Sequence, residues 1–187
     1  YVDRAAWQLT DAGAVLARVF HESDLLVAEM LLDGLLDGLD APGLAALVST
    51  TVYEHRSGDP PPAPWFADDD ARRRWRRLVA ISDDLQSTER RVGLEPHRAP
   101  DPTFGALAYA WVAGEGFTEV VGEEELTGGD FVRTTKQLVD LLRQLAIVAP
   151  APATRRTAAD AASAAFRGVV ADSSLSATDV GVADSSL

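Results

Sequence analysis

The stretch that decides the fold is GGDFVRTTKQLVDLLRQL, residues 128–145. Its apolar residues recur at helical spacing, which predicts a helix with one side facing a core: Phe131, Leu138, Leu142 and Leu145, with Thr135 between them. Thr127 and Asp130 fit a capping box, in which side chains satisfy the first backbone N–H groups of a helix.

The opposite side of this helix is polar over more than two turns. Its residues follow one another at spacings of four, three and four, with Lys136 beside them: Arg133, Gln137, Asp140 and Gln144. Arg and Lys can pair with phosphates, and Gln and Asp can hydrogen-bond to sugars and base edges. Most polar helix faces only contact water, so the pattern alone leaves both interpretations open.

Helical spacing recurs along the rest of the chain, in residues 10–20, 23–38, 40–54, 68–94, 103–114 and 154–170. The first three stretches start with residues that favour the N-cap position: Thr10 or Asp11, Ser23 or Asp24, and Asp40. No segment shows the sustained alternation of a strand. The sequence therefore predicts an all-α, multi-helix bundle that contains one long helix, which begins at Gly128 and stops at Pro150.

One domain is expected over residues 1–175. Prolines and a glycine predict an exposed loop at about 55–67, and small polar residues predict a loosely ordered tail at 176–187. VADSSL occurs at 170–175 and again at 182–187, too short a repeat for a solenoid. Because the chain starts without Met, inside what reads as folded sequence, we expect a segment of a longer protein.

The composition limits the classes of function. Acidic residues number 29 against 17 basic ones, and the net charge of −12 argues against a free-standing nucleic-acid binder. Phosphate contacts would need a local patch or a larger surrounding protein. The lack of cysteine excludes disulfides and thiolate metal sites and fits a cytoplasmic location. No apolar run approaches the roughly 18 residues that span a membrane.

Catalytic motifs are missing from this segment, which has no phosphate loop, no H-E-x-x-H and no G-x-S-x-G. The segment is therefore expected to hold no cofactor. His21, His55 and His97 lie far apart, which favours surface residues over a metal site. The aspartates at 68–70 read as an acidic helix start. The five arginines at 72–77 offer phosphate contact, although a solvated face balanced by these aspartates is the simpler interpretation.

Several motifs, in order, resemble the DSHCT domain, the C-terminal helical domain of DExH-box RNA helicases of the superkiller and exosome-adaptor type. The resemblance is greatest to bacterial members and runs from about Leu9 to Leu175, outside the loop at 60–64. The matching stretches are LTDAGAVLARVF (9–20), SDLLVAEMLLDGLLDGLDAPGLAALVSTTVYE (23–54), AYAWVAGEGFTEVV (108–121) and LTGGDFVRTTKQLVDLLRQLA (126–146).

The resemblance implies a parent protein with RecA-like motor domains that bind ATP and Mg²⁺, followed by a winged-helix domain and this domain. Its long "ratchet" helix would guide single-stranded RNA, or DNA, during unwinding. By motif, the nucleic-acid-binding residues are Arg133, Lys136, Gln137 and Asp140. Gln137 stands where relatives often carry Arg, so one charge is absent, but Gln can still hydrogen-bond to bases or sugar hydroxyls.

Two other functions stay open. Residues 117–142 contain two predicted helices around a glycine-bearing turn, as in a helix-turn-helix DNA-binding domain, although the acidic charge argues against it. The domain could also be a scaffold that docks partner proteins and has no contact with a strand.

Overall fold

The computed structural model describes residues 1–56, 58, 60–116, 120 and 128–178, with the backbone alone for 167–178. Within these residues it contains one two-stranded hairpin and seven helices, which confirms the all-α prediction. The elements are β1 (Val2–Asp3), β2 (Gln8–Leu9), α1 (Asp11–Leu16), α2 (Asp24–Leu32), α3 (Ala41–Val52), α4 (Asp69–Arg91), α5 (Gly105–Ala113), α7 (Gly128–Val148) and α8 (Pro152–Thr178).

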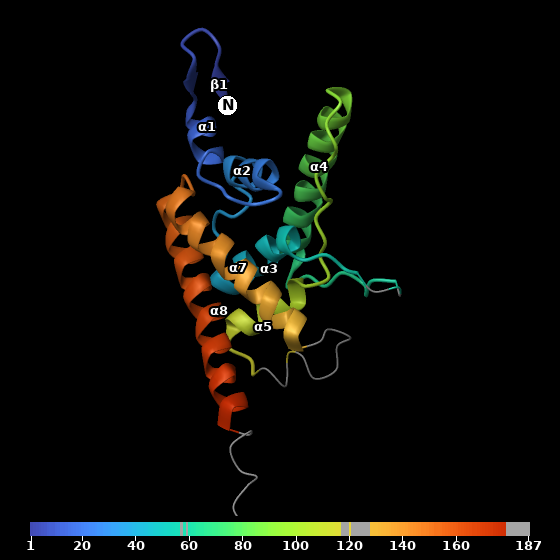
Figure 1. Ribbon diagram of the computed structural model, residues 1–187, viewed down its shortest axis with the longest axis vertical. Helices are drawn as coiled ribbons and strands as arrows, with labels where there is room; N and C mark the ends of the chain where they lie inside the picture. Colours follow the sequence, from blue (N-terminus) through green and yellow to red (C-terminus); the bar gives the residue numbers. More distant parts are fainter. Residues whose placement is uncertain (57, 59, 117–119, 121–127, 179–187) are drawn as a thin grey trace, which may run out of the picture.

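Helices α7 and α8 form the most extensive helix–helix contact among the described residues. They run antiparallel and side by side, joined by residues 149–151, while α3 and α5 pack against them (Figure 1). Helix α4 and the β1–β2 hairpin project upward in Figure 1, on either side of α2. One cluster of buried side chains links all of these helices, so the described residues share a single hydrophobic core.

Local sequence signals set several helix starts. Thr10 is the N-cap of α1 and accepts a hydrogen bond from the Gly13 N–H at 3.1 Å. Asp40 does the same for α3 at 2.9 Å, with Pro42 in the first turn, where a missing N–H costs nothing. Ser23 precedes α2 but makes no side-chain capping bond. The predicted cap at Thr127 lies outside the described residues.

Helix α2 is shorter than the sequence indicates. The apolar spacing continues to Leu36, yet the helix ends at Leu32 and turns follow as far as Gly38. Gly34 and Gly38 adopt positive φ values of 72° and 75°, a region that glycine enters without steric cost. The apolar residues after the break remain useful, because Leu35 and Leu36 are still buried in the core.

The apolar side of α7 is fully buried in that core. The predicted core residues Phe131, Thr135, Leu138, Leu142 and Leu145 are each at most 1 % exposed. At the start of the helix, the Phe131 ring lies 5.6 Å from that of Phe104 and 5.1 Å from that of Trp111. Full burial contributes roughly 1.5–3 kcal/mol for each large apolar side chain, so α7 is firmly anchored.

Helix α8 approaches its neighbours closely because its inner face is made of alanine. Ala158, Ala161 and Ala165 are fully buried. The indole N–H of Trp111 on α5 donates to the carbonyl of Ala165 at 3.0 Å, which a larger side chain at this contact would obstruct.

The β1–β2 hairpin is an addition that the sequence did not predict. Val2 pairs with Leu9 and Asp3 with Gln8, so each strand has only two residues. The carbonyl of Tyr1 accepts a hydrogen bond from the Thr10 N–H at 3.0 Å and reaches the first turn of α1 at Gly13.

Candidate nucleic-acid interface

The polar side of α7 is open in the described structure. All four residues that the sequence predicts as nucleic-acid-binding are exposed: Arg133, Lys136, Gln137 and Asp140. We call these four residues the polar strip. They lie on the helix face opposite Phe131 and Leu142, and that buried face fixes the strip in position.

The charges of the strip are only weakly engaged. The Arg133 guanidinium donates to the Asp130 carboxylate at 3.3 Å, and Arg143 lies 3.8 Å from the Asp140 carboxylate. Lys136 has no ion-pair partner among the described residues. Exposed pairs of this kind contribute about 0–1 kcal/mol, so a phosphate group can displace them at little cost.

Arg143 extends the strip and is missing from the sequence prediction. It follows Lys136 by seven residues, or about two helical turns, and its side chain is 54 % exposed. Its guanidinium carbon lies 5.0 Å from the ring centroid of Phe166 on α8. The spacing from Lys136 could have identified Arg143, whereas Phe166 could not be placed beside it from sequence alone.

The side chain of Gln144, the last residue of the predicted polar row, is engaged in hydrogen bonds within the protein. It is half-buried, and its side-chain oxygen accepts a hydrogen bond from the Phe20 N–H at 2.7 Å. Its amide group donates to the Phe20 carbonyl at 3.4 Å. Gln144 therefore attaches the segment between α1 and α2 to α7, and that segment closes this end of the row.

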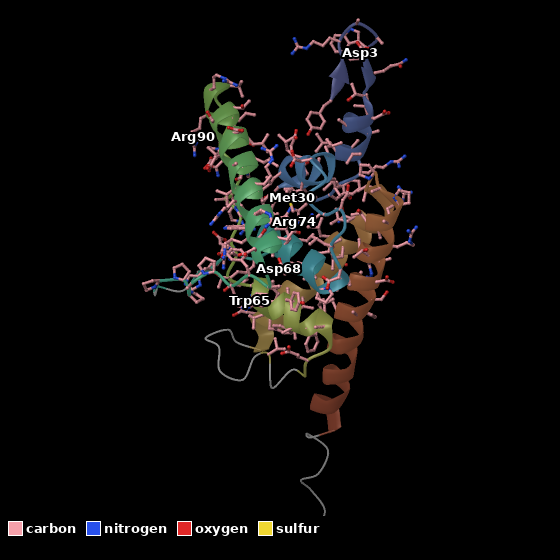
Figure 2. The ribbon with its side chains drawn as sticks, turned by 180° about the vertical axis from the view of Figure 1, so that it is seen from behind. Asp3, Met30, Trp65, Asp68, Arg74 and Arg90 are labelled. Atoms are coloured by element: carbon pink, nitrogen blue, oxygen red, sulfur yellow. The ribbon has the colours of Figure 1, made fainter. Side chains whose placement is uncertain are left out.

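Three of the five arginines at 72–77 pair with the aspartates at the start of α4, as the simpler interpretation expected. Arg72 pairs with Asp69 at 3.0 Å and Arg73 with Asp70 at 2.9 Å. Arg74, which is labelled on α4 in Figure 2, also binds Asp70. It donates to the Leu35 and Asp37 carbonyls beyond α2 at 2.6 and 2.9 Å. These contacts stabilise the first turns of α4 and link them to the turns after α2.

The acidic start of α4 has a capping role. The Asp68 carboxylate accepts a hydrogen bond from the Ala71 N–H at 2.7 Å and forms the N-cap (Figure 2). Further along α4, Arg77 hydrogen-bonds Asp33 and holds the pKa of that carboxyl below its usual range. No group of three His, Asp or Glu residues in the described part of the chain could hold a metal ion.

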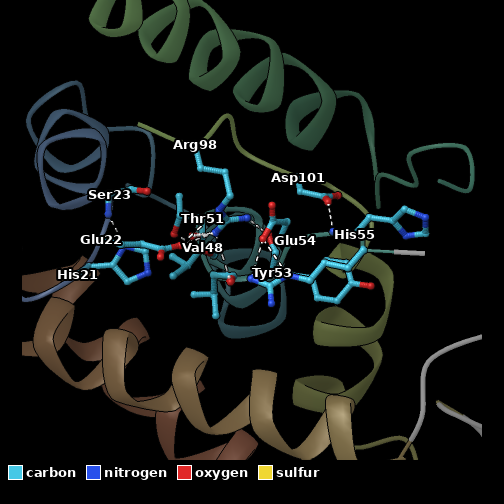
Figure 3. Close-up of polar contacts among 12 residues, drawn as sticks. His21, Glu22, Ser23, Val48, Thr51, Tyr53, Glu54, His55, Arg98 and Asp101 are labelled. Atoms are coloured by element: carbon cyan, nitrogen blue, oxygen red, sulfur yellow. Dashed lines mark hydrogen bonds and ion pairs between the residues drawn. The ribbon is translucent and has the colours of Figure 1, made fainter. Parts of the chain in front are cut away.

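The three histidines have separate structural surroundings. His97 lies 2.9 Å from the Glu89 carboxylate through Nδ1 and 3.0 Å from the Ser82 hydroxyl through Nε2. His21 accepts a hydrogen bond from the Ser23 N–H at 3.0 Å through Nδ1, and burial lowers its pKa. The backbone N–H of His55 donates to Asp101 at 2.6 Å (Figure 3).

Arg98 is the centre of a polar network that the sequence did not reveal. Its guanidinium donates to the carbonyls of Thr51, Val52 and Tyr53 at the end of α3, and it pairs with Glu22 at 2.9 Å (Figure 3). The last carbonyls of a helix lack partners within the helix. Arg98, from a distant segment, supplies the missing hydrogen-bond donors and holds the end of α3 in place.

None of the described helices combines the length and the apolar character that crossing a membrane requires. Residues 117–119 and 121–127, which hold the first helix of the helix-turn-helix interpretation, lie outside the described residues.

The described features define a class: a helical domain that presents one long, well-anchored helix with an open polar side. A family model for the DSHCT (NUC185) domain matches residues 6–173, and the chain belongs to this family. This confirms the resemblance seen in the sequence.

The relatives include proteins named as helicases. "Probable helicase HelY" of Mycobacterium tuberculosis (strain ATCC 25618 / H37Rv) is 39 % identical over 160 residues, which are 80 % of this chain and 18 % of the relative. HelY of Mycobacterium leprae is 38 % identical over 161 residues, 81 % and 18 % of the two chains. "Exosome RNA helicase MTR4" of Homo sapiens is 24 % identical over 140 residues, 74 % and 13 %. The chain therefore spans less than a fifth of the length of these relatives.

Proposed function

We propose that this domain guides single-stranded RNA along α7 in a parent helicase whose motor domains bind ATP and Mg²⁺. The observation that supports this most is the polar strip, which stays exposed while the opposite side of α7 is buried in the core. The names of the relatives support the helicase part of the proposal, because HelY and MTR4 carry the matching segment.

The charges on and beside the polar strip favour weak binding of a strand. Arg133, Lys136 and Arg143 supply cations, and Asp130 and Asp140 lie among them. Individual hydrogen bonds contribute roughly 1 kcal/mol, so a strand would be held by contacts that break and form again as the motor moves. Gln137 and Asp140 would hydrogen-bond to sugar hydroxyls or bases, since neither side chain can neutralise a phosphate.

The direct test measures the affinity of the 187-residue chain for a short, fluorescently labelled single-stranded RNA over a series of salt concentrations. We expect Arg133→Ala with Lys136→Ala to lower the affinity about tenfold at low salt. The slope of log affinity against log salt should become shallower by about 1.4, because roughly 0.7 is lost for each phosphate contact on a single strand.

The matched control is Arg72→Ala with Arg73→Ala, which removes the same charge from the exposed side of α4. Equal losses of affinity in both double variants would mean that only overall charge matters, and the proposal for α7 would fail. Sharp preference for one duplex DNA sequence would instead favour the helix-turn-helix interpretation.

The parent protein provides the second test. There, the Arg133→Ala, Lys136→Ala variant should unwind RNA more slowly and show less RNA-stimulated ATP hydrolysis. Normal unwinding together with loss of a protein partner would favour the scaffold.

A further inference from the structure

A groove opens between α7 and α8 at the edge of the polar strip. Its volume is about 520 Å³, within the roughly 300–1,000 Å³ typical of small-molecule sites. Its lining is mostly apolar and includes small side chains on α8: Arg143, Ala146, Ile147, Ala159, Ala162, Ser163 and Phe166. We call it the α7–α8 groove.

Two large apolar side chains of the groove are exposed to solvent. Ile147 is 70 % exposed and Phe166 is 46 % exposed, although Arg143 lies over the Phe166 ring. Leaving apolar surface in water costs free energy, so an occupant that covers this surface would be stabilised.

The groove has the chemistry of a site for a flat aromatic ring. Unpaired RNA bases stack on aromatic side chains and on the planar guanidinium of Arg, and Arg143 with Phe166 provides both surfaces at one place. The alanines and the serine of α8 leave room for a ring near the helix backbone. Stacking accepts every base, because every base has a π face.

The position of the groove favours a base over a protein side chain. Arg143 belongs both to the groove and to the exposed side of α7, where it follows Lys136 by two turns and pairs with Asp140. A strand whose phosphates contact Arg133 and Lys136 would therefore pass the mouth of the groove.

We propose that Arg143 and Phe166 form a stacking subsite that holds one base of the single strand. This rests on the proposed function, since the strand must lie on α7 for its base to reach the groove. The phosphate contacts would tolerate sliding, whereas a base that enters and leaves the groove would divide the movement into single-nucleotide steps.

The test uses the 187-residue chain and short single-stranded RNAs that carry 2-aminopurine, an adenine analogue whose emission falls when it stacks. Wild-type protein should quench the emission. Phe166→Leu should remove most of the quenching and weaken binding about fivefold or more, the lower range for loss of one stacked base. The salt dependence should not change, because no charge is removed.

Two further variants separate stacking from other roles. Phe166→Trp keeps an aromatic surface and should preserve both quenching and affinity. Arg143→Lys keeps the charge but removes the planar group, so it should reduce quenching with an unchanged salt dependence. Trp7→Leu is the control, since Trp7 is 84 % exposed on the hairpin and should have no effect.

Each outcome distinguishes the two proposals. Suppose that Phe166→Leu binds and quenches like wild type while the Arg133→Ala, Lys136→Ala variant binds more weakly. The proposed stacking subsite is then wrong, and the proposed strand contacts of the polar strip are supported. If only the Phe166 variant binds RNA more weakly, the strand contacts proposed for the polar strip are wrong. If the wild-type chain binds no single-stranded RNA, both are wrong.

Discussion

One hydroxyl group lies unsatisfied beneath the polar strip. Thr135 is 1 % exposed on the buried side of α7, and its Oγ1 has no hydrogen-bond partner among the described residues. A buried polar group without a partner costs about 1–3 kcal/mol. Thr154, also buried, is its opposite, because its hydroxyl donates to the Asp37 carboxylate.

We expect Thr135→Val to raise the free energy of unfolding by about 1 kcal/mol, because valine fills the same space without a hydroxyl. Thr154→Val should lower it by about 1.5–3 kcal/mol, since a hydrogen bond to a charged group is lost. Urea unfolding monitored by circular dichroism measures both. A destabilised Thr135→Val would show that its hydroxyl has a partner in solution.

At the residue scale, the sequence predicts what depends on near neighbours. The caps at Thr10 and Asp40 and the buried side of α7 follow from spacing within one or two turns. The environments of Arg98 and Phe166 do not, because Arg98 binds carbonyls more than 40 residues away and Phe166 meets α7 only after the chain reverses. Which of the exposed polar residues contact a strand stays a prediction.

The end of helix α3 depends on another segment of the chain. A helix usually ends with a glycine or with side chains of its own last turn. In α3 the carbonyls of Thr51 and Val52 instead receive hydrogen bonds from Arg98 at 2.8 and 3.3 Å. The stability of α3 and the placement of the segment that holds Arg98 are therefore coupled.

We expect Arg98→Met to lower the free energy of unfolding by about 2–4 kcal/mol, because several carbonyls lose a charged donor. Arg56→Met is the control. Arg56 is 78 % exposed and pairs only with Glu54 among contacts to described residues, so its loss should cost less than about 1 kcal/mol. Urea midpoints compare the two, and hydrogen exchange at the last amides of α3 should be faster only in the Arg98 variant. Equal midpoints would contradict the coupling.

At the element scale, long periodic stretches were predicted well and short or interrupted elements were not. Helices α3, α4, α5 and α7 match their predicted ranges to within a few residues. The α2 stretch stops early because two glycines can take positive φ, a choice that apolar spacing does not reveal. Strands of two residues are too short for any alternation to appear, so the hairpin was missed.

The stability of the whole molecule should depend on pH through His21. Burial lowers the pKa of this imidazole; the nearby Glu22 and Asp24 oppose the shift and Arg98 adds to it. Its Nδ1 also accepts the Ser23 N–H, which requires the neutral form. Below the unfolded pKa of about 6.5 the unfolded chain binds a proton more readily than the folded one, so stability falls as the pH decreases.

We expect the free energy of unfolding of the wild type to decrease as the pH is lowered from 7.5 to 5.5. One proton accounts for at most about 1.4 kcal/mol for each pH unit. His21→Asn should reduce this step, because its amide oxygen can accept the same N–H without binding a proton. His55→Asn should keep it. A full step in His21→Asn would assign the effect to another group.

A second loss of stability should follow at more acidic pH. Burial alone would raise the pKa of Glu89, but the hydrogen bonds from the His97 N–H and ring outweigh this and lower it. A lowered carboxyl pKa stabilises the fold above the unfolded value of about 4.3, and this is lost as the pH falls further. The two windows are separate, so the loss of stability from Glu89 does not overlap with the loss from His21.

At this scale, net charge was a poor guide to the surface. The chain carries −12 overall, yet Asp68 caps α4, and Asp69 and Asp70 are paired with arginines of the same helix. The open side of α7 has its own local balance, which composition cannot report.

The absence of a side chain at Gly13 allows the first residues of the chain to pack against α1. A Cβ atom at this position would lie 2.0 Å from the carbonyl oxygen of Tyr1, closer than real Cβ contacts come, and the obstacle is backbone that cannot rotate away. Even the smallest replacement would have to push the first strand off the helix. A saturation library at position 13 that is selected for folded protein should therefore return glycine alone. The path of the first strand past α1 thus depends on the absence of a side chain at this position.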